Sequence, residues 1–487
     1  MIRVALAAAL LVPGISCVSA PPTTQPTTDI AVPAEFGQPA AAESTGVRAN
    51  WWNDFGEHGL AAAVDQALQY NTDLLAAAAR VAGAEASARI AGADLGPQLG
   101  ASALGTRRKQ NFVGFPIPGN NDRVLSTTST NYGVSLELSW EADLWGRLGA
   151  QAREGLANYQ ASEAEYAGAL LSIAAQTTKA WFAVAEAQQQ VALAERTVAS
   201  FTRSSEQVRA RFERGVRPAL DLRLAMAQAS AAGATLLARR QQVDAAGRQL
   251  QVLLGVYPGG EYEFPATLIG TPAPVPSGLP ADLVARRPDL AAAERRLVAA
   301  DQRLRGARAA LYPRLSLTTS GGTSSNQLGD LVKGDFSVWS LIGNLVAPLL
   351  QGGRLRAGVD LAQAGIDEAT ATYVGTALRA YAEVESALAA ETLLADQVRQ
   401  LAAASEQSGS AERLAGERYR NGLEGYVTVL EAQRRTFDAE SAVLSGHRQR
   451  LDNRVDLYLA LGGGFHVERS RASTTSTPPE LPSENQR

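Results

Sequence analysis

The chain has 487 residues, with 45 Lys or Arg against 49 Asp or Glu, and a formal net charge of −4. This length exceeds that of one ordinary domain, and the near balance of charge gives no electrostatic reason to expect a nucleic-acid partner. The single cysteine excludes a disulfide within the chain.

Residues 1–17 predict a signal peptide and a lipid attachment site. Arg3 precedes an apolar run that is too short to span a membrane. Cys17 follows that run at once, as in the lipidation site of bacterial lipoproteins, although Gly14 stands where leucine is usual. An ordinary exported protein with an incidental cysteine is therefore the alternative. Val18, where aspartate would favour the inner membrane, indicates the outer membrane.

Residues 18–50 are rich in Pro, Thr and Ala, and they predict an extended tether. Trp51 opens the folded part, in which a helix is expected to run to about Leu95 and to stop before Pro97.

A β-hairpin is predicted at about 98–140, because apolar and polar side chains alternate with a period of two toward its end. The apolar members are Tyr132, Val134, Leu136, Leu138 and Trp140. Gly, Pro and Asn between 114 and 123 are typical of a loop. A strand of about ten residues suits a tilted membrane strand, and a soluble hairpin is the alternative.

The stretch 143–214 predicts one very long helix with a coiled-coil seam, since two sets of residues each recur every seven positions. They are Thr177, Val184, Val191, Val198, Ser205 and Phe212, and Ile173, Ala180, Ala187, Ala194, Phe201 and Val208. Roughly 70 residues at about 1.5 Å each give a rod of about 105 Å. A tight turn and a helix to Leu254 complete a first structural repeat, 51–255, before a Pro/Gly-rich linker at 256–281.

The same pattern occurs again in a second structural repeat, 282–465, with its hairpin at about 314–345. Gly215 matches Gly422, and Leu254 matches Leu461, each at an offset of 207 residues. The tail 466–487 is rich in Ser, Thr, Pro and Glu and is predicted to be disordered.

No later stretch holds about 20 consecutive apolar residues, so a membrane crossing would have to use β-strands closed into a barrel. Four strands are too few for a membrane barrel, so several chains would have to share one. Enzyme chemistry finds no support: His58, His447 and His466 lie far apart, and neither a Gly-x-Ser-x-Gly elbow nor a phosphate-binding glycine loop occurs. We therefore expect no catalytic residues, no cofactor and no metal site.

Several motifs together resemble the TolC-like outer-membrane factors of bacterial efflux and secretion systems, most closely their drug-efflux lipoprotein branch. The motifs are Trp52-Asn53-Asp54-Phe55, Asn71-x-Asp73-Leu74, Trp140-Glu141-x-Asp143-Leu144-Trp145-Gly146-Arg147, Arg286-Arg287-Pro288-Asp289-Leu290, Ala293-Glu294 and Pro348 through Gly353. Each is weak alone, and they cover about 50 to 465.

The resemblance implies a mostly α fold with membrane β-strands, in which long coiled-coil helices and two β-hairpins per chain assemble as a homotrimer. Its twelve-stranded outer-membrane β-barrel would continue into an α-helical barrel through the periplasm. The implied partners are outer-membrane lipid, a periplasmic adaptor protein and an inner-membrane pump of the resistance-nodulation-division type. The implied function is a passive, gated conduit for small-molecule export.

The resemblance also implies a gate at the periplasmic tips and adaptor docking at the turns of Gly215 and Gly422. Asp221 and Tyr419 match positions of the family's polar links, and Glu431 matches an acidic pore ring. Glu424 stands where some members carry the linking arginine, so closure would need another cation, such as Arg217 or Arg420. A plain helix N-terminal acid is the alternative for Asp221.

Glu137, on the polar face of its strand, would point into the lumen of a barrel; an exposed glutamate of a soluble hairpin is the alternative. Two other functions stay open: a periplasmic coiled-coil scaffold or adaptor without a pore, and a conduit for protein secretion or metal export. Metal export usually brings methionine or histidine clusters, and the chain has only Met1 and Met226.

Overall fold

The computed structural model describes residues 49–112, 124–259, 262, 264–272, 275 and 286–464. All of them fall in one compact unit, Pro33–Arg487. The predicted signal peptide with Cys17, nearly all of the tether, the loop at 114–123, much of the linker and the tail lie outside the described residues.

The first half of the chain forms η1 (Trp51–Phe55), α1 (His58–Tyr70), α2 (Thr72–Ala93), β1 (Gln98–Phe112), β2 (Leu125–Ala142), α3 (Arg147–Glu213) and α4 (Ala219–Leu253). The second half forms α6 (Pro288–Ala309), β3 (Arg314–Ser325), η2 (Leu328–Asp330), η3 (Gly334–Phe336), β4 (Ser337–Val346), α7 (Arg354–Arg420) and α8 (Tyr426–Ala460).

Corresponding helices of the two halves have equal lengths. The long helices α3 and α7 have 67 residues each, α4 and α8 have 35 each, and α2 and α6 have 22 each. The mostly α fold with two β-hairpins, expected from the sequence, is confirmed.

The helix expected from 51 to 95 is instead divided into η1, α1 and α2. Asn71 has an extended backbone, and its side-chain oxygen accepts hydrogen bonds from the backbone N–H groups of Asp73 and Leu74. An asparagine that caps a new helix in this way ends the preceding one, because its side chain replaces the helical backbone as the acceptor.

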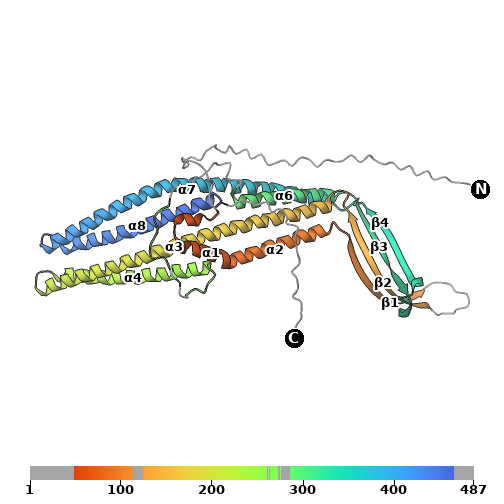
Figure 1. Cartoon of the computed structure of the whole chain (residues 1–487), viewed down its shortest axis with the longest axis horizontal. Helices are drawn as coiled ribbons and strands as arrows, with labels where there is room; N and C mark the ends of the chain where they lie inside the picture. Colours follow the sequence, from red (N-terminus) through yellow and green to blue (C-terminus); the bar gives the residue numbers. More distant parts are fainter. Residues whose placement is uncertain are drawn as a thin grey trace, which may run out of the picture. The chain divides into compact units, whose positions relative to one another are not determined.

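The four strands form one antiparallel sheet in the order β1-β2-β3-β4. Each hairpin supplies two neighbours, and the pairing of β2 with β3, from Tyr132 opposite Ser325 to Ala142 opposite Leu315, joins the two hairpins. Each strand connects to one of the helices α2, α3, α6 and α7 (Figure 1), so the order of the helices repeats the order of the strands.

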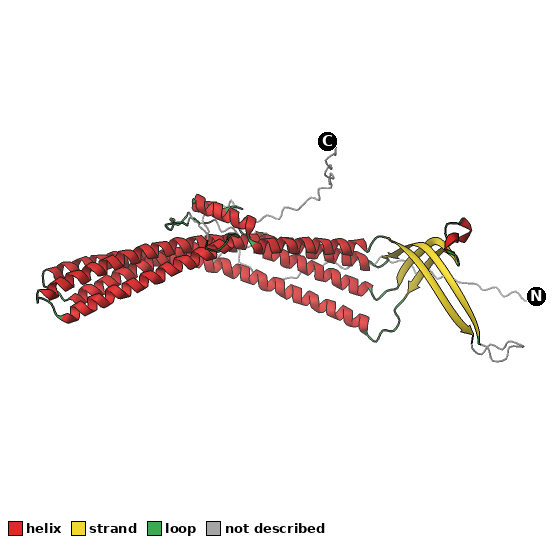
Figure 2. Ribbon diagram, turned by 90° about the horizontal axis from the view of Figure 1, so that it is seen from below, coloured by secondary structure: helices red, strands yellow, loops and turns green. Residues whose placement is uncertain are grey.

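The helices lie side by side along the two long ones. Near the sheet, α3 packs against α2 and α6, and α6 packs against α7. Farther from the sheet, α3 packs against α4 and α8, and α7 packs against α8. Figure 2 shows the helices running alongside one another, with the sheet at one end. The seam of Ile173, Ala180, Ala187, Ala194, Phe201 and Val208 is buried throughout.

The main core lies where α1, α3, α4 and α8 meet. Trp51 is fully buried, and its ring stacks on Tyr458 at 4.9 Å between centroids. The Tyr458 hydroxyl donates to Asp54 at 3.0 Å. Trp51 and the Trp52-Asn53-Asp54-Phe55 motif that follows it thus hold the start of the described chain against α8.

Candidate functional site

The two turns farthest from the sheet end α3 and α7 in the same way. Gly215 and Gly422 have φ angles of 72° and 76°, a left-handed conformation that favours glycine. At the first turn, the backbone N–H groups of Val216 and Gly215 donate to the carbonyl oxygens of Arg211 and Phe212, respectively. At the second turn, the N–H groups of Leu423 and Gly422 donate in the same way to the carbonyl oxygens of Arg418 and Tyr419. This is the Schellman arrangement, which satisfies carbonyl groups that a helix end otherwise leaves free.

Tyr419, at the end of α7, contacts the first turn. Its side chain is 4% exposed, and the guanidinium groups of Arg211 and Arg217 each lie 4.7 Å from the centre of its ring. Both arginines belong to the first turn, and the tyrosine belongs to the second. We call these three residues the arginine–tyrosine clasp, and each cation–ring contact contributes about 0.5 to 1 kcal/mol at a partly exposed site.

Hydrogen bonds reinforce the arginine–tyrosine clasp. Arg211 donates to the backbone oxygens of Tyr419 at 3.1 Å and Arg420 at 3.3 Å. Arg217 donates to the backbone oxygen of Glu424 at 3.3 Å. The first turn therefore binds carbonyl groups of the second, and this contact does not depend on an acidic side chain there.

Asp221 lies in the first turn of α4 and is 8% exposed. Neither a hydrogen bond nor an ion pair of its carboxylate is found among the described residues. Asp221 acts on the neighbouring Tyr426. Burial has the largest effect on the Tyr426 hydroxyl, and together with the charges of Tyr419 and Asp221 it raises the pKa of that hydroxyl to about 12. Tyr419 and Tyr426 belong to a small buried cluster at the tips with Val208 and Ala225.

The side chains of the other predicted tip residues lie apart from the arginine–tyrosine clasp, and only the backbone oxygens of Glu424 and Arg420 accept hydrogen bonds from it. The Glu424 carboxylate is 3.5 Å from Arg418 and accepts a hydrogen bond from Thr428 at 3.1 Å. Glu431 is exposed on α8 and pairs with Arg435, one turn along, at 3.1 Å. Arg420 is exposed, and in the described part of the chain its side chain has no ion pair.

Sequence reasoning gave no role to Arg211 or Tyr426. Arg211 has a counterpart in Arg418 at the offset of 207, so its basic character is a property of the repeat. Tyr426 has Ala219 as its counterpart, and this difference between the halves was the only available signal. Neither pattern indicates that a ring of one half lies between arginines of the other.

The sheet has two chemically different faces. One face carries Leu136 and Leu138 of β2 together with Leu99 of β1 and Leu341 of β4, and these side chains are between 36% and 69% exposed. The opposite face carries Glu137, exposed between Gly100 and Ser320. Serines dominate this polar face, and two pairs of them, Ser102 with Ser135 and Ser320 with Ser340, are hydrogen-bonded.

The motif from Trp140 to Arg147 fixes the junction between β2 and α3. Asp143 caps α3 by accepting hydrogen bonds from the backbone N–H groups of Leu148 and Gly149. Glu141 pairs with Arg147 at 2.8 Å. The Trp145 indole donates to the backbone oxygen of Pro313, which ties the first half of the chain to the second.

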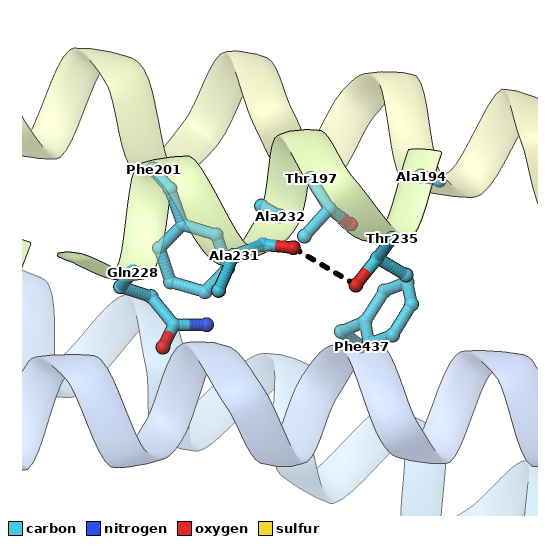
Figure 3. A pocket seen from close by; sticks show the side chains of 8 residues that line it. All are labelled: Ala194, Thr197, Phe201, Gln228, Ala231, Ala232, Thr235 and Phe437. Atoms are coloured by element: carbon cyan, nitrogen blue, oxygen red, sulfur yellow. Dashed lines mark hydrogen bonds between the residues drawn. The ribbon is translucent and has the colours of Figure 1, made fainter. Parts of the chain in front are cut away.

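A small hollow and a larger open recess lie among the described residues. Figure 3 shows a cavity of about 60 Å³ between α3, α4 and α8, where Thr235 donates to the backbone oxygen of Ala231. This space admits only a few water molecules, well below the volume of about 300 Å³ or more that small-molecule sites occupy. A second hollow of about 460 Å³ is an open recess beside the polar face of the sheet, near Glu141 and Arg147.

Across the described part of the chain, none of the helices combines the length and apolar character needed to cross a membrane. The described His, Asp and Glu side chains also form no group of three or more placed to hold a metal ion.

The sequence matches the family described as "Outer membrane efflux protein" over residues 63–256 and 279–463. The chain belongs to this family of efflux conduits. Its matched residues cover both structural halves, and the assignment agrees with the expected TolC-like resemblance.

Among the curated relatives, the chain is 34% identical to outer membrane protein OprJ of Pseudomonas aeruginosa over 465 residues, which cover 93% of this chain and 94% of OprJ. It is 32% identical to the toluene efflux pump outer membrane protein TtgF of Pseudomonas putida over 336 residues, 69% of this chain and 70% of TtgF.

The solved structures that this chain resembles are also outer-membrane channels. Superposition on the CmeC outer membrane channel of Campylobacter jejuni gives a TM-score of 0.84 at 26% sequence identity, and the matched residues cover 92% of this chain and 95% of CmeC. The open state of the MtrE outer membrane channel of Neisseria gonorrhoeae gives 0.78 at 30% identity, with 92% and 99% covered. The present chain is therefore an outer-membrane efflux channel protein, and it extends into the periplasm.

Proposed function

We propose that three copies of the chain form the outer-membrane channel of a tripartite pump that exports small molecules. The observation that carries this proposal is the sheet, whose exposed apolar face and serine-rich polar face suit lipid on one side and water on the other. Three copies would contribute twelve strands to one closed sheet. Glu137 would then face the water-filled lumen.

The channel is oriented with its long helices in the periplasm and the β1–β2 connection outside the cell. A periplasmic adaptor meets the helix tips, and an inner-membrane pump of the resistance-nodulation-division type drives transport. Both turns support adaptor docking, because each exposes an apolar pair at equivalent positions. These are Val216 and Leu220 in the first turn, and Leu423 and Val427 in the second, each more than half exposed.

Cys17 is the proposed lipid anchor, on the sequence pattern described above. A variant in which Cys17 is replaced by Ser should lose the mass of the attached lipid while the sheet still requires detergent for extraction. Soluble protein after this one change would argue against a membrane-embedded sheet.

The arginine–tyrosine clasp is the proposed element that holds the tips closed, and Asp221 is buried at the start of α4 nearby. Opening requires the α7–α8 pair to move relative to the α3–α4 pair, and this movement separates Tyr419 from Arg211 and Arg217. Glu424 contributes its backbone oxygen to this contact, while Glu431 lies apart from it. Of the two cations that the sequence offered, Arg217 and Arg420, Arg217 is thus the one that we propose for closure.

Planar-bilayer conductance of the purified channel tests both proposals. Arg211→Ala combined with Arg217→Ala removes two cation–ring contacts, about 1 to 2 kcal/mol, together with the hydrogen bonds to the second turn, so the ratio of open to closed channel should rise at least about tenfold. Arg214→Ala is the matched control, since Arg214 is exposed in the same turn.

A folded, detergent-extracted trimer that never conducts, in wild type or variant, would contradict the channel proposal. Conductance that is equal in wild type, in the double variant and in the control would leave the channel in place and reject the arginine–tyrosine clasp as its closing element.

A further inference from the structure

The β1–β2 hairpin extends beyond the four-stranded part of the sheet. Its ladder continues to Phe112 opposite Leu125, whereas the pairing of β2 with β3 ends at Tyr132 opposite Ser325. Residues 106–112 and 125–131 therefore form a two-stranded ribbon, which we call the outer ribbon. All of the β1 residues in it are exposed.

Charge in the outer ribbon has one sign. Arg107, Arg108 and Lys109 are consecutive in β1, and neither Asp nor Glu occurs in the described residues of the outer ribbon. No ion pair of these three cations is found among the described residues. In the connection between β3 and β4, by contrast, Asp330 is paired with Lys333 at 2.8 Å.

The strand register assigns the three cations to different faces. Residues 99, 101 and 103 of β1 lie on the apolar face, so Arg107 and Lys109 continue that face and Arg108 continues the polar one. Arg107 is opposite Thr130, and Lys109 is opposite Thr128. On the face that meets lipid, two cations thus lie beside two hydroxyl groups.

The position along the strand places these residues at head-group depth. Tyr132 pairs with Gly105 near the end of the apolar face, where transmembrane strands usually carry an aromatic residue. Arg107 and Lys109 are two and four residues farther out, or about 7 and 13 Å at about 3.3 Å per residue. They therefore lie beyond the hydrocarbon layer, where lipid head groups begin.

We infer that Arg107 and Lys109, with Thr128 and Thr130, bind phosphate groups of the phosphorylated glycolipid in the outer leaflet. This inference relies on the outward orientation of the sheet proposed above. Guanidinium and ammonium groups form charge-assisted hydrogen bonds with phosphate oxygens, and the hydroxyls supply additional donors. Two cations, rather than a single contact, hold the hairpin in the lipid surface.

The test measures binding of bisphosphorylated lipid A to the full-length channel in detergent. Arg107→Ser combined with Lys109→Ser should weaken binding roughly thirtyfold, because each basic residue at a lipid surface contributes a factor of about five. Arg108→Ser is the matched control: it removes a neighbouring charge on the opposite face and should leave the affinity near that of wild type.

Two further arms identify the ligand. Lipid A without phosphate groups should bind wild type as weakly as phosphorylated lipid A binds the double variant. Displacement of the lipid by millimolar inorganic phosphate would overturn the lipid assignment in favour of a general anion site. An equal loss in the Arg108 variant, or no loss in the double variant, would overturn the inference itself.

Trimer assembly and conductance are measured on the same samples. Both should be unchanged in all three proteins, so that failure of lipid binding is distinguishable from failure of the channel proposal.

Discussion

At the scale of single residues, the structure places ionisable groups inside the helical region. α8 faces α3 through polar contacts: Lys179 pairs with Asp456, and Glu186 lies near Arg448. Asp452 lies between them and pairs with Arg448 at 2.6 Å. Burial is the larger influence on it, so the pKa of Asp452 is raised to about 6.

This shift predicts a pH dependence of stability. The folded chain retains a proton on Asp452 up to about pH 6, whereas the unfolded chain releases it near 3.8. The free energy of unfolding therefore falls as pH rises from about 4 to about 6. Asp452→Asn should be more stable than wild type at pH 7, by about 1 to 3 kcal/mol, and should lose this advantage near pH 4.

Thermal unfolding in detergent across this pH range measures the difference. Asp456→Asn removes a charge one turn away and breaks the pair with Lys179, so it should not stabilise the protein at any pH. Parallel profiles for wild type and Asp452→Asn would contradict the prediction.

A close backbone approach makes one glycine essential. Gly255 has a φ of 71°, and a Cβ atom there would lie 2.4 Å from the backbone oxygen of Tyr70. Gly255→Ala should cost more than the 1 to 2 kcal/mol, roughly, of the left-handed conformation alone. Gly56 has a φ of 70° with open space around it, so Gly56→Ala should cost only that amount. Equal losses of unfolding free energy in the two variants would show that the contact with Tyr70 relaxes without cost.

At the scale of elements, short motifs secure the points where helices end and begin. Asn71 caps α2, and its amide also donates to the backbone oxygen of Leu253 at the end of α4. In the second half, Arg287 reaches the backbone oxygen of Ala460 at the end of α8. Different side chains thus make the same connection in the two halves.

Substitutions of Asn71 separate its two roles. Asn71→Ser keeps an oxygen for the cap and loses the bond to Leu253, so it should cost about 1 kcal/mol. Asn71→Ala loses both and should cost about 2 to 3 kcal/mol, measured as the change in unfolding free energy. If Ser and Ala cost the same, the cap contributes nothing measurable.

At the scale of the whole molecule, the sheet determines where the channel resides. Leu136 and Ser135 are neighbours in β2 on opposite faces, opposite Ala101 and Ser102 of β1. If the apolar face meets lipid, Leu136→Arg should destabilise the assembled channel by about 2 to 4 kcal/mol. Ser135→Arg faces the lumen and should be tolerated.

The yield of trimers extracted from outer membranes measures this prediction. Equal yields from the two variants would mean that the faces are not distinguished by lipid, and the proposed membrane placement would fail.

The sequence alone determined the elements that depend on local pattern. The heptad seam at Ile173 through Val208, the alternation at Tyr132 through Trp140 and the offset of 207 residues predicted the long helices, the hairpins and the repeated plan. The break at Asn71 was missed, although its capping chemistry is also local, because the apolar pattern continues across it.

Only the tertiary structure decided which distant residues meet. It pairs β2 with β3, places Tyr419 between Arg211 and Arg217, and directs Arg217 to the backbone of Glu424 instead of to an acidic side chain. The sequence offered acidic partners, Asp221 and Glu424, for Arg217 because charge is visible in a sequence. Contact with a ring or a carbonyl group depends on how two helix ends pack, and no periodicity along the chain encodes that packing.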